Sequence, residues 1–240
     1  MKIGDTLYVP VRLLPNADQY PYALYTTVVQ NLIGKKASVR LPGGLTSRLL
    51  AKSKLHITCG ILVIRIGDFA TEVATLDPLA KSVLQFSRLL LEDSSVRLLE
   101  VRSLDELSEW WRINEAAYTQ VVLIGHGAPD GMIFGVGGKR SAADIAAALT
   151  PCAHPKTIIS LSCETGRAAF SRELSQSASF SRVIAPFHSV HAAVASQFVQ
   201  TFLSNHLVLG RSAKVAWKDA RRAVPGTDSF RNWRSGVMES

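Results

Sequence analysis

Two short apolar runs, each ending at a side chain that can take part in chemistry, constrain this chain most. Val121–Ile124 leads through Gly125 into His126, and Thr157–Ser162 leads into Cys163. Both runs are rich in β-branched residues and are bounded by Gly, Pro or polar residues, which is typical of buried parallel strands. The sequence therefore predicts an open α/β sheet with His126 and Cys163 just past the carboxyl ends of neighbouring strands.

Composition places the chain among ordinary globular proteins. It has 240 residues, of which 47% are hydrophobic and 19% are charged, enough to fill a sizeable core. No apolar run reaches the roughly 20 residues of a membrane helix, and the first residues lack the apolar stretch of a signal peptide. The three cysteines follow no disulfide framework. We therefore expect a cytoplasmic protein with free thiols and no membrane contact.

The net charge of +8 is unevenly distributed. Residues 1–56 contain eight Lys and Arg against two Asp, a net charge of +6. Such a segment can meet nucleic acid or an acidic partner surface. The alternative is a solvated face, and we favour it because the segment lacks the interleaved aromatic and basic residues of single-strand binders.

Residues 1–57 are predicted to form a small all-β module. Short strand-like runs alternate with Gly- and Pro-containing turns and show no helical period, which favours a small barrel. The expected strands are Asp5–Val11, Tyr22–Asn31, Ala37–Leu41 and Arg48–Ile57. The opening Gly-Asp strand and the Lys-rich turn resemble those of SH3-like barrels.

Residues 58–240 are predicted to form a second, α/β domain. Strands alternate with helices, which implies a mostly parallel sheet covered on both faces. Further strands are expected at Ile61–Ile66, Val96–Val101 and Val183–Ala185, with a hairpin at Met132–Gly138. Helices are expected from an Asp77 N-cap with Pro78 at the first position, and at Asp105–Ala117, Ser141–Leu149, Thr165–Ser175, Val190–Leu207 and Ser212–Ala223. The tail after Pro225 is polar, and we expect it to be loose.

Cys163 and His126 form the expected reactive pair. A helix beginning at Cys163 would place a positive dipole end and free N–H groups beside the thiolate. The N–H groups of Cys163 and Gly127 would then form an oxyanion hole. A lone His at a strand end is usually a polar cap, and a lone Cys is usually a core residue. Their order after two successive strands favours the catalytic interpretation.

The remaining cysteines suggest no second site. Cys152 and His154 lie close together, but no paired CxxC or HxxxH accompanies them, so we expect no metal and no cofactor. Cys59 lies at the expected domain junction and is interpreted as a core residue.

The sequence resembles the caspase-like (clan CD) cysteine peptidases, and most of all their CHAT domains, over residues 60–224. LSCETG at residues 161–166 is similar to the family stretch LSACESG but is one residue shorter, and His126-Gly127 stands 37 residues before Cys163. A later family stretch aligns with residues 185–193. There His188 and His191 replace the usual Trp and Asp, which alters the expected substrate pocket.

The resemblance implies a fold and an activity. It implies a caspase-like three-layer sandwich and a cysteine endopeptidase in which His126 is the general base and Cys163 the nucleophile. It also implies a protein substrate, a regulatory protein partner, and a role in bacterial antiviral defence or cell death. Asp130, Glu164 and His188 are candidates for the substrate pocket, although a turn Asp and a helix-terminal Glu are the ordinary interpretations of the two acids. Cleavage after Asp, after Arg or Lys, or after Asn stays open.

Two other functions stay open. One is a catalytically inactive caspase-like scaffold or binding module. The other is a nucleic-acid-binding regulator acting through the basic N-terminal module.

Overall fold

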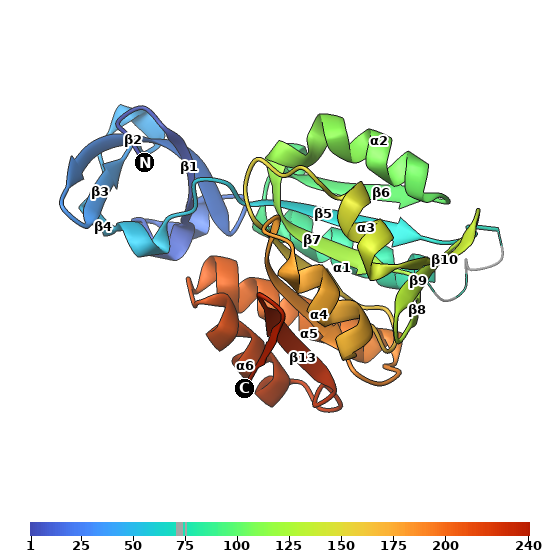
Figure 1. The fold of residues 1–240 in the computed structure, drawn as a ribbon. Helices are drawn as coiled ribbons and strands as arrows, with labels where there is room; N and C mark the ends of the chain where they lie inside the picture. The colour runs from blue at the N-terminus through green and yellow to red at the C-terminus, as the bar shows by residue number, and fades with distance from the viewer. Residues whose placement is uncertain (71–73, 75) are drawn as a thin grey trace.

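The computed structural model describes residues 1–70, 74 and 76–240. A small antiparallel β region precedes a larger α/β region (Figure 1). The predicted fold class, an α/β domain with a mostly parallel sheet preceded by a small all-β module, is confirmed. The boundary between residues 57 and 58 stays a prediction.

The small region is a four-stranded antiparallel sheet in the order β1-β2-β3-β4. Its strands are β1 (Thr6–Pro10), β2 (Leu24–Ile33), β3 (Lys36–Val39) and β4 (Leu50–Ala51). Their inward side chains, among them Leu7, Val9 and Val29, form a separate small core. The strand predicted over Arg48–Ile57 is wrong in extent. After β4 the lysine-containing segment Lys52–Lys54 forms a 3₁₀ turn instead, and only His56 returns to pair with Tyr8.

The large sheet has seven strands in the order β14-β13-β12-β11-β7-β5-β6. The five strands from β6 to β12 are parallel, and β13 and β14 complete the sheet in antiparallel pairings. The parallel strands are β5 (Gly60–Ile66), β6 (Val96–Val101), β7 (Tyr118–Ile124), β11 (Lys156–Ser160) and β12 (Phe180–Pro186). Among the five parallel strands, the three central ones, β5, β7 and β11, are buried on both faces.

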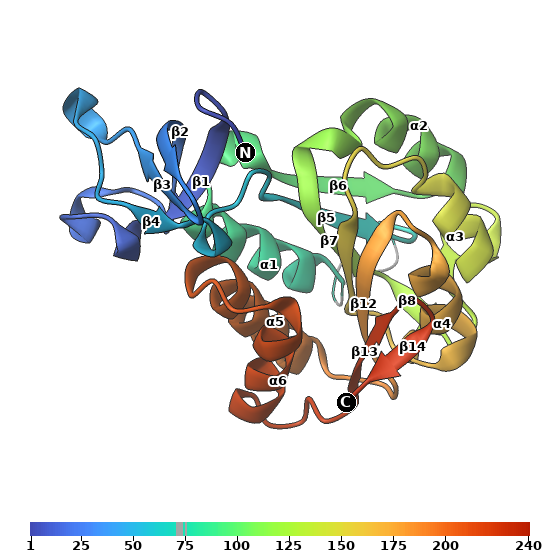
Figure 2. The same ribbon diagram turned by 60° about the vertical axis from the view of Figure 1, so that its left-hand side comes forward.

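Helices cover both faces of the sheet (Figure 2). One face carries α1 (Leu76–Leu90), α5 (Ala192–Leu203) and α6 (Ala213–Ala223). The other carries α2 (Leu104–Asn114), α3 (Ala142–Ala148) and α4 (Ala168–Gln176). Alternate residues of β5 enter the two cores, with Ile61 and Val63 on one side and Leu62 and Ile64 on the other. Among the described residues, no helix has the length and apolar character needed to cross a bilayer.

The predicted N-cap of α1 is wrong, because the described helix already includes Leu76. Asp77 lies inside the first turn and forms ion pairs with Arg65 at 3.3 Å and with Lys81 at 2.7 Å. Arg65 is buried in strand β5 and also pairs with Glu100 at 2.7 Å. A buried guanidinium needs compensating carboxylates, and Asp77 is one of them.

The expectation of a loose C-terminal tail is also wrong. Residues Phe230–Arg234 form β13 and Val237–Glu239 form β14, and β13 pairs with β12. Phe230 and Trp233 are buried, and the Trp233 indole donates to the carbonyl oxygen of Gly166 at 3.1 Å. The tail therefore covers the edge of β12 that would otherwise present unpaired backbone groups.

Basic side chains of the β region cap the end of a helix in the α/β region. After α5 the chain forms a π-helical turn, η7 (Ser204–Val208), whose last carbonyls have no partner within the helix. Arg12, Lys54 and His56 hydrogen-bond to this helix end, which favours positive charge. The contacts are Arg12 Nε to Val208 O at 2.6 Å, Arg12 Nη2 to Leu209 O at 2.7 Å, Lys54 Nζ to Gly210 O at 3.0 Å and His56 Nε2 to Leu207 O at 3.1 Å.

This junction predicts a pH dependence of stability. Burial lowers the pKa of His56 and of His206, whose rings lie 6.3 Å apart, below the ordinary value of 6.5. The unfolded chain therefore binds more protons than the folded chain, and stability falls as the pH drops below about 6.5. Thermal unfolding between pH 5 and 8 should show this loss.

Substitution assigns the pH dependence to this pair. His56→Gln with His206→Asn keeps amide donors in place of the imidazoles but removes the titration, so the slope of Tm against pH should become shallower. His154→Gln, in an exposed loop, is the matched control and should leave the slope unchanged. An equal slope in the double variant and the wild type would contradict the assignment.

Candidate functional site

His126 leaves the large sheet at the carboxyl end of β7. It opens a small three-stranded antiparallel sheet formed by β8 (His126–Ala128), β9 (Gly131–Phe134) and β10 (Gly138–Ser141). His126 lies opposite Ile133 in this sheet and its side chain is exposed. The antiparallel pairing fixes the backbone that carries the imidazole.

Cys163 follows β11, the strand that lies directly beside β7. Ser160 pairs with Leu123, and the Leu161 N–H donates to the Leu123 carbonyl at 2.8 Å. Both chains therefore leave the sheet at the same edge, as the sequence predicted for parallel strands. Cys163 lies three residues beyond Ser160 and is half-buried.

The predicted helix start at Cys163 is wrong. Glu164 has a positive φ of 63°, and helix α4 begins only at Ala168. The chain first makes a turn in which the Arg167 N–H donates to the Glu164 carbonyl at 3.1 Å. Cys163 is therefore not the first residue of a helix, because left-handed backbone cannot continue into an α-helix. Among the described residues, no acceptor binds the backbone N–H of Cys163, which leaves this group available to a ligand.

A glycine contact joins the two loops. A Cβ atom on Gly127 would overlap the carbonyl oxygen of Cys163 and would lie 2.9 Å from Cγ2 of Thr165. The close approach of two backbones here requires glycine. The structure therefore brings the His126-Gly127 segment against the backbone of Cys163.

Buried hydroxyl groups form hydrogen bonds with the backbone of the turn around Cys163. Thr165 Oγ1 donates to the Ser162 carbonyl at 2.7 Å, so Ser160 Oγ is the donor in its 2.8 Å contact with Thr165 Oγ1. Ser160 Oγ also accepts from the Ser162 N–H at 3.3 Å, and Ser171 Oγ donates to the Thr165 carbonyl at 2.6 Å. All four residues are buried, so these bonds fix the turn in a protected environment.

The two acidic pocket candidates are engaged in ion pairs. Asp130 lies exposed in the turn between β8 and β9 and pairs with Lys139 at 2.8 Å, whose hydrogen bond lowers the pKa of Asp130. Glu164, directly after Cys163, pairs with Arg167 at 2.9 Å. Each carboxylate therefore already has a cationic partner.

His188 follows β12 at the same edge of the sheet. Its exposed ring meets Phe187 edge to face, with centroids 4.9 Å apart. Phe187 also packs under the guanidinium groups of Arg167 at 4.7 Å and Arg231 at 5.5 Å. A Cβ on Gly166 would lie 2.7 Å from the Pro186 carbonyl carbon, so this aromatic and cationic cluster borders the turn after Cys163.

The other thiols occupy different environments. Cys59 is fully buried, and burial raises its pKa to about 12. Cys152 is half-buried, and burial raises its pKa as well. Within the described ranges, no group of three or more His, Cys, Asp or Glu side chains is arranged to hold a metal ion.

Comparison with known proteins identifies the architecture. The sequence matches no protein-family model and no curated protein. A secreted C11 cysteine protease from Bacteroides thetaiotaomicron, solved with an irreversible peptide inhibitor, superposes with a TM-score of 0.54 at 10% identity, covering 74% of this chain and 66% of that chain. The fold is that of the caspase-like cysteine proteases, as the sequence predicted. A second structure of such a C11 protease, called iotapain, gives a TM-score of 0.53 at 9% identity over 74% of this chain and 67% of that chain.

The caspase-like fold is shared, while sequence identity near 10% leaves activity to be argued from this chain's own residues. The chain spans 66% of the length of the first of these relatives. The assignment of His126 and Cys163 as a dyad stays a prediction, and the hydroxyl network of Ser160, Thr165 and Ser171 was not predicted. Its only sequence signal is the density of Ser and Thr around Cys163.

Thr165 offers a direct test of that network. Thr165→Val removes the hydroxyl shared by Ser160 and Ser162 and leaves buried polar groups unpaired, so the free energy of unfolding should fall by about 1–3 kcal/mol. Urea unfolding measures this change. Thr165→Ser keeps the hydroxyl and should lose less stability than Thr165→Val, whereas equal losses would show that the hydroxyl bonds are unimportant.

Gly127→Ala tests the contact between the loops. The added methyl group must push the Cys163 backbone away, at a cost of about 1–3 kcal/mol, and should change the rate at which iodoacetamide alkylates Cys163. Gly138→Ala is the control, because its added methyl group meets no neighbour although φ is 67°. That control should lose stability without changing the alkylation rate. An unchanged rate in Gly127→Ala would contradict the close contact.

Proposed function

We propose that this protein is a cysteine endopeptidase in which His126 and Cys163 form the catalytic dyad. The observation that carries the proposal is the packing of Gly127 on the carbonyl of Cys163, at the carboxyl edge of two adjacent parallel strands. The caspase-like fold, shared with two C11 cysteine proteases, supports the same chemistry. The substrate is a protein or peptide.

The dyad acts by nucleophilic catalysis. His126 takes the proton of the Cys163 thiol, and the sulfur forms a bond to the scissile carbonyl carbon while the carbonyl oxygen gains the negative charge. The free N–H of Cys163, with that of Gly127, stabilises this oxyanion. The C–N bond then breaks, and His126 gives its proton to the leaving amine. Water attacks the resulting thioester with His126 as base, which releases the carboxylic acid and restores the thiol.

The pocket geometry bears on specificity. The carboxylates of Asp130 and Glu164 are paired with Lys139 and Arg167. A carboxylate that already has a partner is less available to a cationic substrate side chain. We retain Asp130, Glu164 and His188 as pocket residues that border the scissile bond.

The finer assignments rest on the sequence resemblance. LSCETG at residues 161–166 supports a CHAT-type peptidase, and that relationship in turn supports a regulatory partner and a role in antiviral defence or cell death. The SH3-like character of the N-terminal module and a cytoplasmic location belong to the same proposal. The alternative function, nucleic-acid binding, relies on the basic residues of the N-terminal module. Two of them, Arg12 and Lys54, are already hydrogen-bonded to a helix end.

An electrophilic peptide probe read by intact mass tests the dyad. Wild-type protein should gain one label, Cys163→Ala should gain none, and His126→Ala should react about 10²–10⁴-fold more slowly because the general base is lost. Cys152→Ala is the matched thiol control and should label as wild type. Labelling at Cys59 or Cys152 instead, or equal rates in wild type and His126→Ala, would favour an inactive scaffold.

A further inference from the structure

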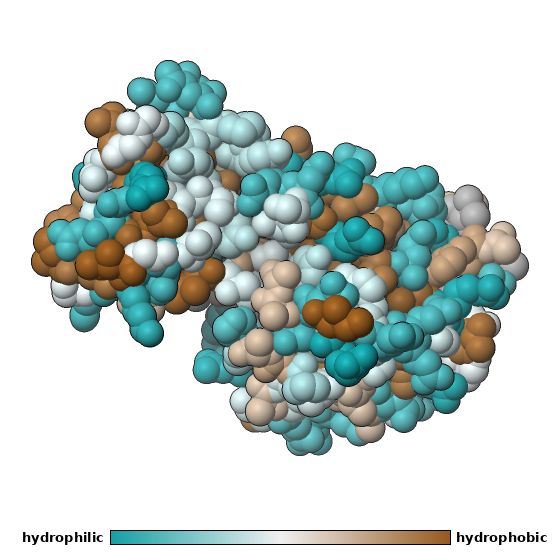
Figure 3. Space-filling view, turned by 90° about the horizontal axis from the view of Figure 1, so that it is seen from above, coloured by the Kyte–Doolittle hydropathy of each residue, from teal (hydrophilic) through white to brown (hydrophobic). Residues whose placement is uncertain are grey.

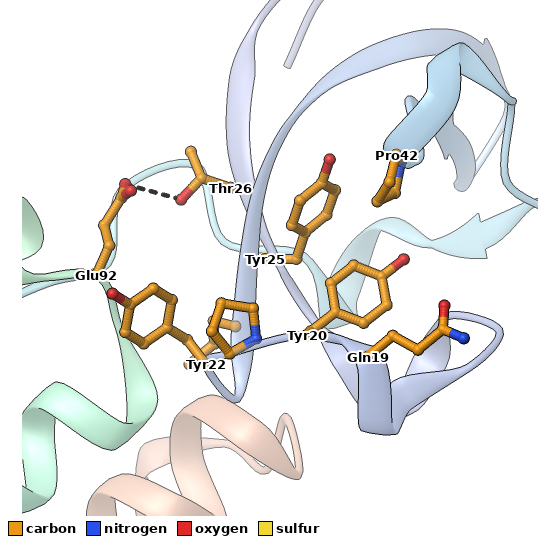
Figure 4. Close-up of a pocket in the computed structure, with 9 residues that line it drawn as sticks. Gln19, Tyr20, Tyr22, Tyr25, Thr26, Pro42 and Glu92 are labelled. Atoms are coloured by element: carbon orange, nitrogen blue, oxygen red, sulfur yellow. Dashed lines mark hydrogen bonds between the residues drawn. The ribbon is translucent and has the colours of Figure 1, made fainter.

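The β region has an aromatic hollow where it meets the segment after α1 (Figure 4). Its volume is about 270 Å³. The half-buried rings of Tyr20 and Tyr25 meet edge to face at a centroid distance of 5.0 Å, so this wall of the hollow is already packed. Tyr22 and Glu92 lie at the opposite end from Pro42 (Figure 4). The remaining lining residues are Gln19, Pro21, Leu24 and Thr26.

Two further hollows continue this one into a groove. The next hollow shares Gln19, Tyr20 and Pro42 with the first and adds Leu45. The third shares residues with the second and ends at Arg48. Leu45 is 68% exposed, and Figure 3 shows hydrophobic side chains gathered on this end of the molecule. Because neighbouring hollows share lining residues, the three lie next to one another across the β region, and we refer to them together as the groove.

The charges at the two ends of the groove differ. Glu92 is the one carboxylate among the described residues that line the first hollow, and Thr26 Oγ1 donates to it at 3.1 Å, which holds the carboxylate in place. Arg48 lines the far hollow. Of the other basic residues of this region, Arg12 and Lys54 are hydrogen-bonded to the helix end described above. The aromatic end of the groove is therefore complementary to a cation.

The groove lies far from the candidate active site. The β region adjoins the beginning of β5, whereas Cys163 and His126 follow the carboxyl ends of β11 and β7 (Figure 1). None of the three hollows is lined by a residue near Cys163. The groove is therefore not a subsite for residues next to a scissile bond.

We propose that this groove binds an extended segment of a separate protein, with one Arg or Lys side chain at the Tyr22–Glu92 end. A cation there meets the ring of Tyr22 and the hydrogen-bonded carboxylate of Glu92. The Tyr20 and Tyr25 rings lie nearer Pro42 and receive the neighbouring residues of the segment. Apolar residues of the same segment lie over Pro42 and Leu45. The packed tyrosines limit the ordering cost of binding. The inference does not depend on the proposed peptidase activity.

Selection from a random heptapeptide library tests the groove. The full chain carrying Cys163→Ala is used, so that no bound peptide can be cleaved. We expect enrichment of Arg or Lys at one fixed position with apolar neighbours. Fluorescence polarisation of the best peptide should show about 10-fold weaker binding for Glu92→Gln and for Tyr25→Ala. Tyr25→Phe keeps the ring, and Glu173 is an exposed residue of α4 far from the groove, so Tyr25→Phe and Glu173→Gln should both bind as before.

Charge reversal gives the sharpest test. Glu92→Arg should change the enriched residue from Arg or Lys to Asp or Glu, and thermal unfolding verifies that the variant is folded. Absence of positional enrichment, or enrichment that survives both Glu92→Arg and Tyr25→Ala, would overturn the proposal. Self-association that the same variants abolish would identify a second copy of the chain as the occupant and would also overturn it. Labelling of Cys163 in the wild-type background is measured separately, so failure of the groove and failure of the dyad remain distinguishable.

Discussion

Burial of both faces of β5, β7 and β11 is the constraint on which the rest of this structure depends. Ile61, Leu62 and Val63 enter opposite cores in turn, so these strands have no solvated face on which to carry polar chemistry. Reactive side chains are left at the strand ends, and the parallel order of the strands brings those ends to one edge. The same burial explains why α1, α5 and α6 must cover one face and α2, α3 and α4 the other.

Local contacts determine the conformation of the loops at the carboxyl edge of the sheet. The absence of a side chain at Gly127 lets one loop touch the backbone of the next, and the left-handed backbone of Glu164 turns the chain away before α4 begins. The hydroxyls of Ser160 and Thr165 satisfy backbone groups that this irregular turn leaves without helical partners. The thiol is thus carried on a non-helical turn that the buried polar network makes rigid.

The sequence predicts features that depend on local pattern and misses those that depend on distant partners. The β-branched runs before His126 and Cys163 predicted the central strands correctly, because a strand buried on both faces is visible as a run of consecutive residues in the sequence. The C-terminal strands were missed because Asn232 is buried through a hydrogen bond to Glu239, which breaks the apolar alternation. The groove was missed because Tyr20, Pro42 and Glu92 meet only after folding. The dyad and the pocket residues remain predictions about chemistry.

The position of the β region at the beginning of β5 has a geometric consequence. Strand β5 has seven residues, and at a rise of about 3.3 Å per residue it spans roughly 23 Å. The beginning of β5, which the β region adjoins, and the edge that carries His126 and Cys163 therefore lie at opposite ends of the sheet. A segment bound in the groove leaves that edge uncovered.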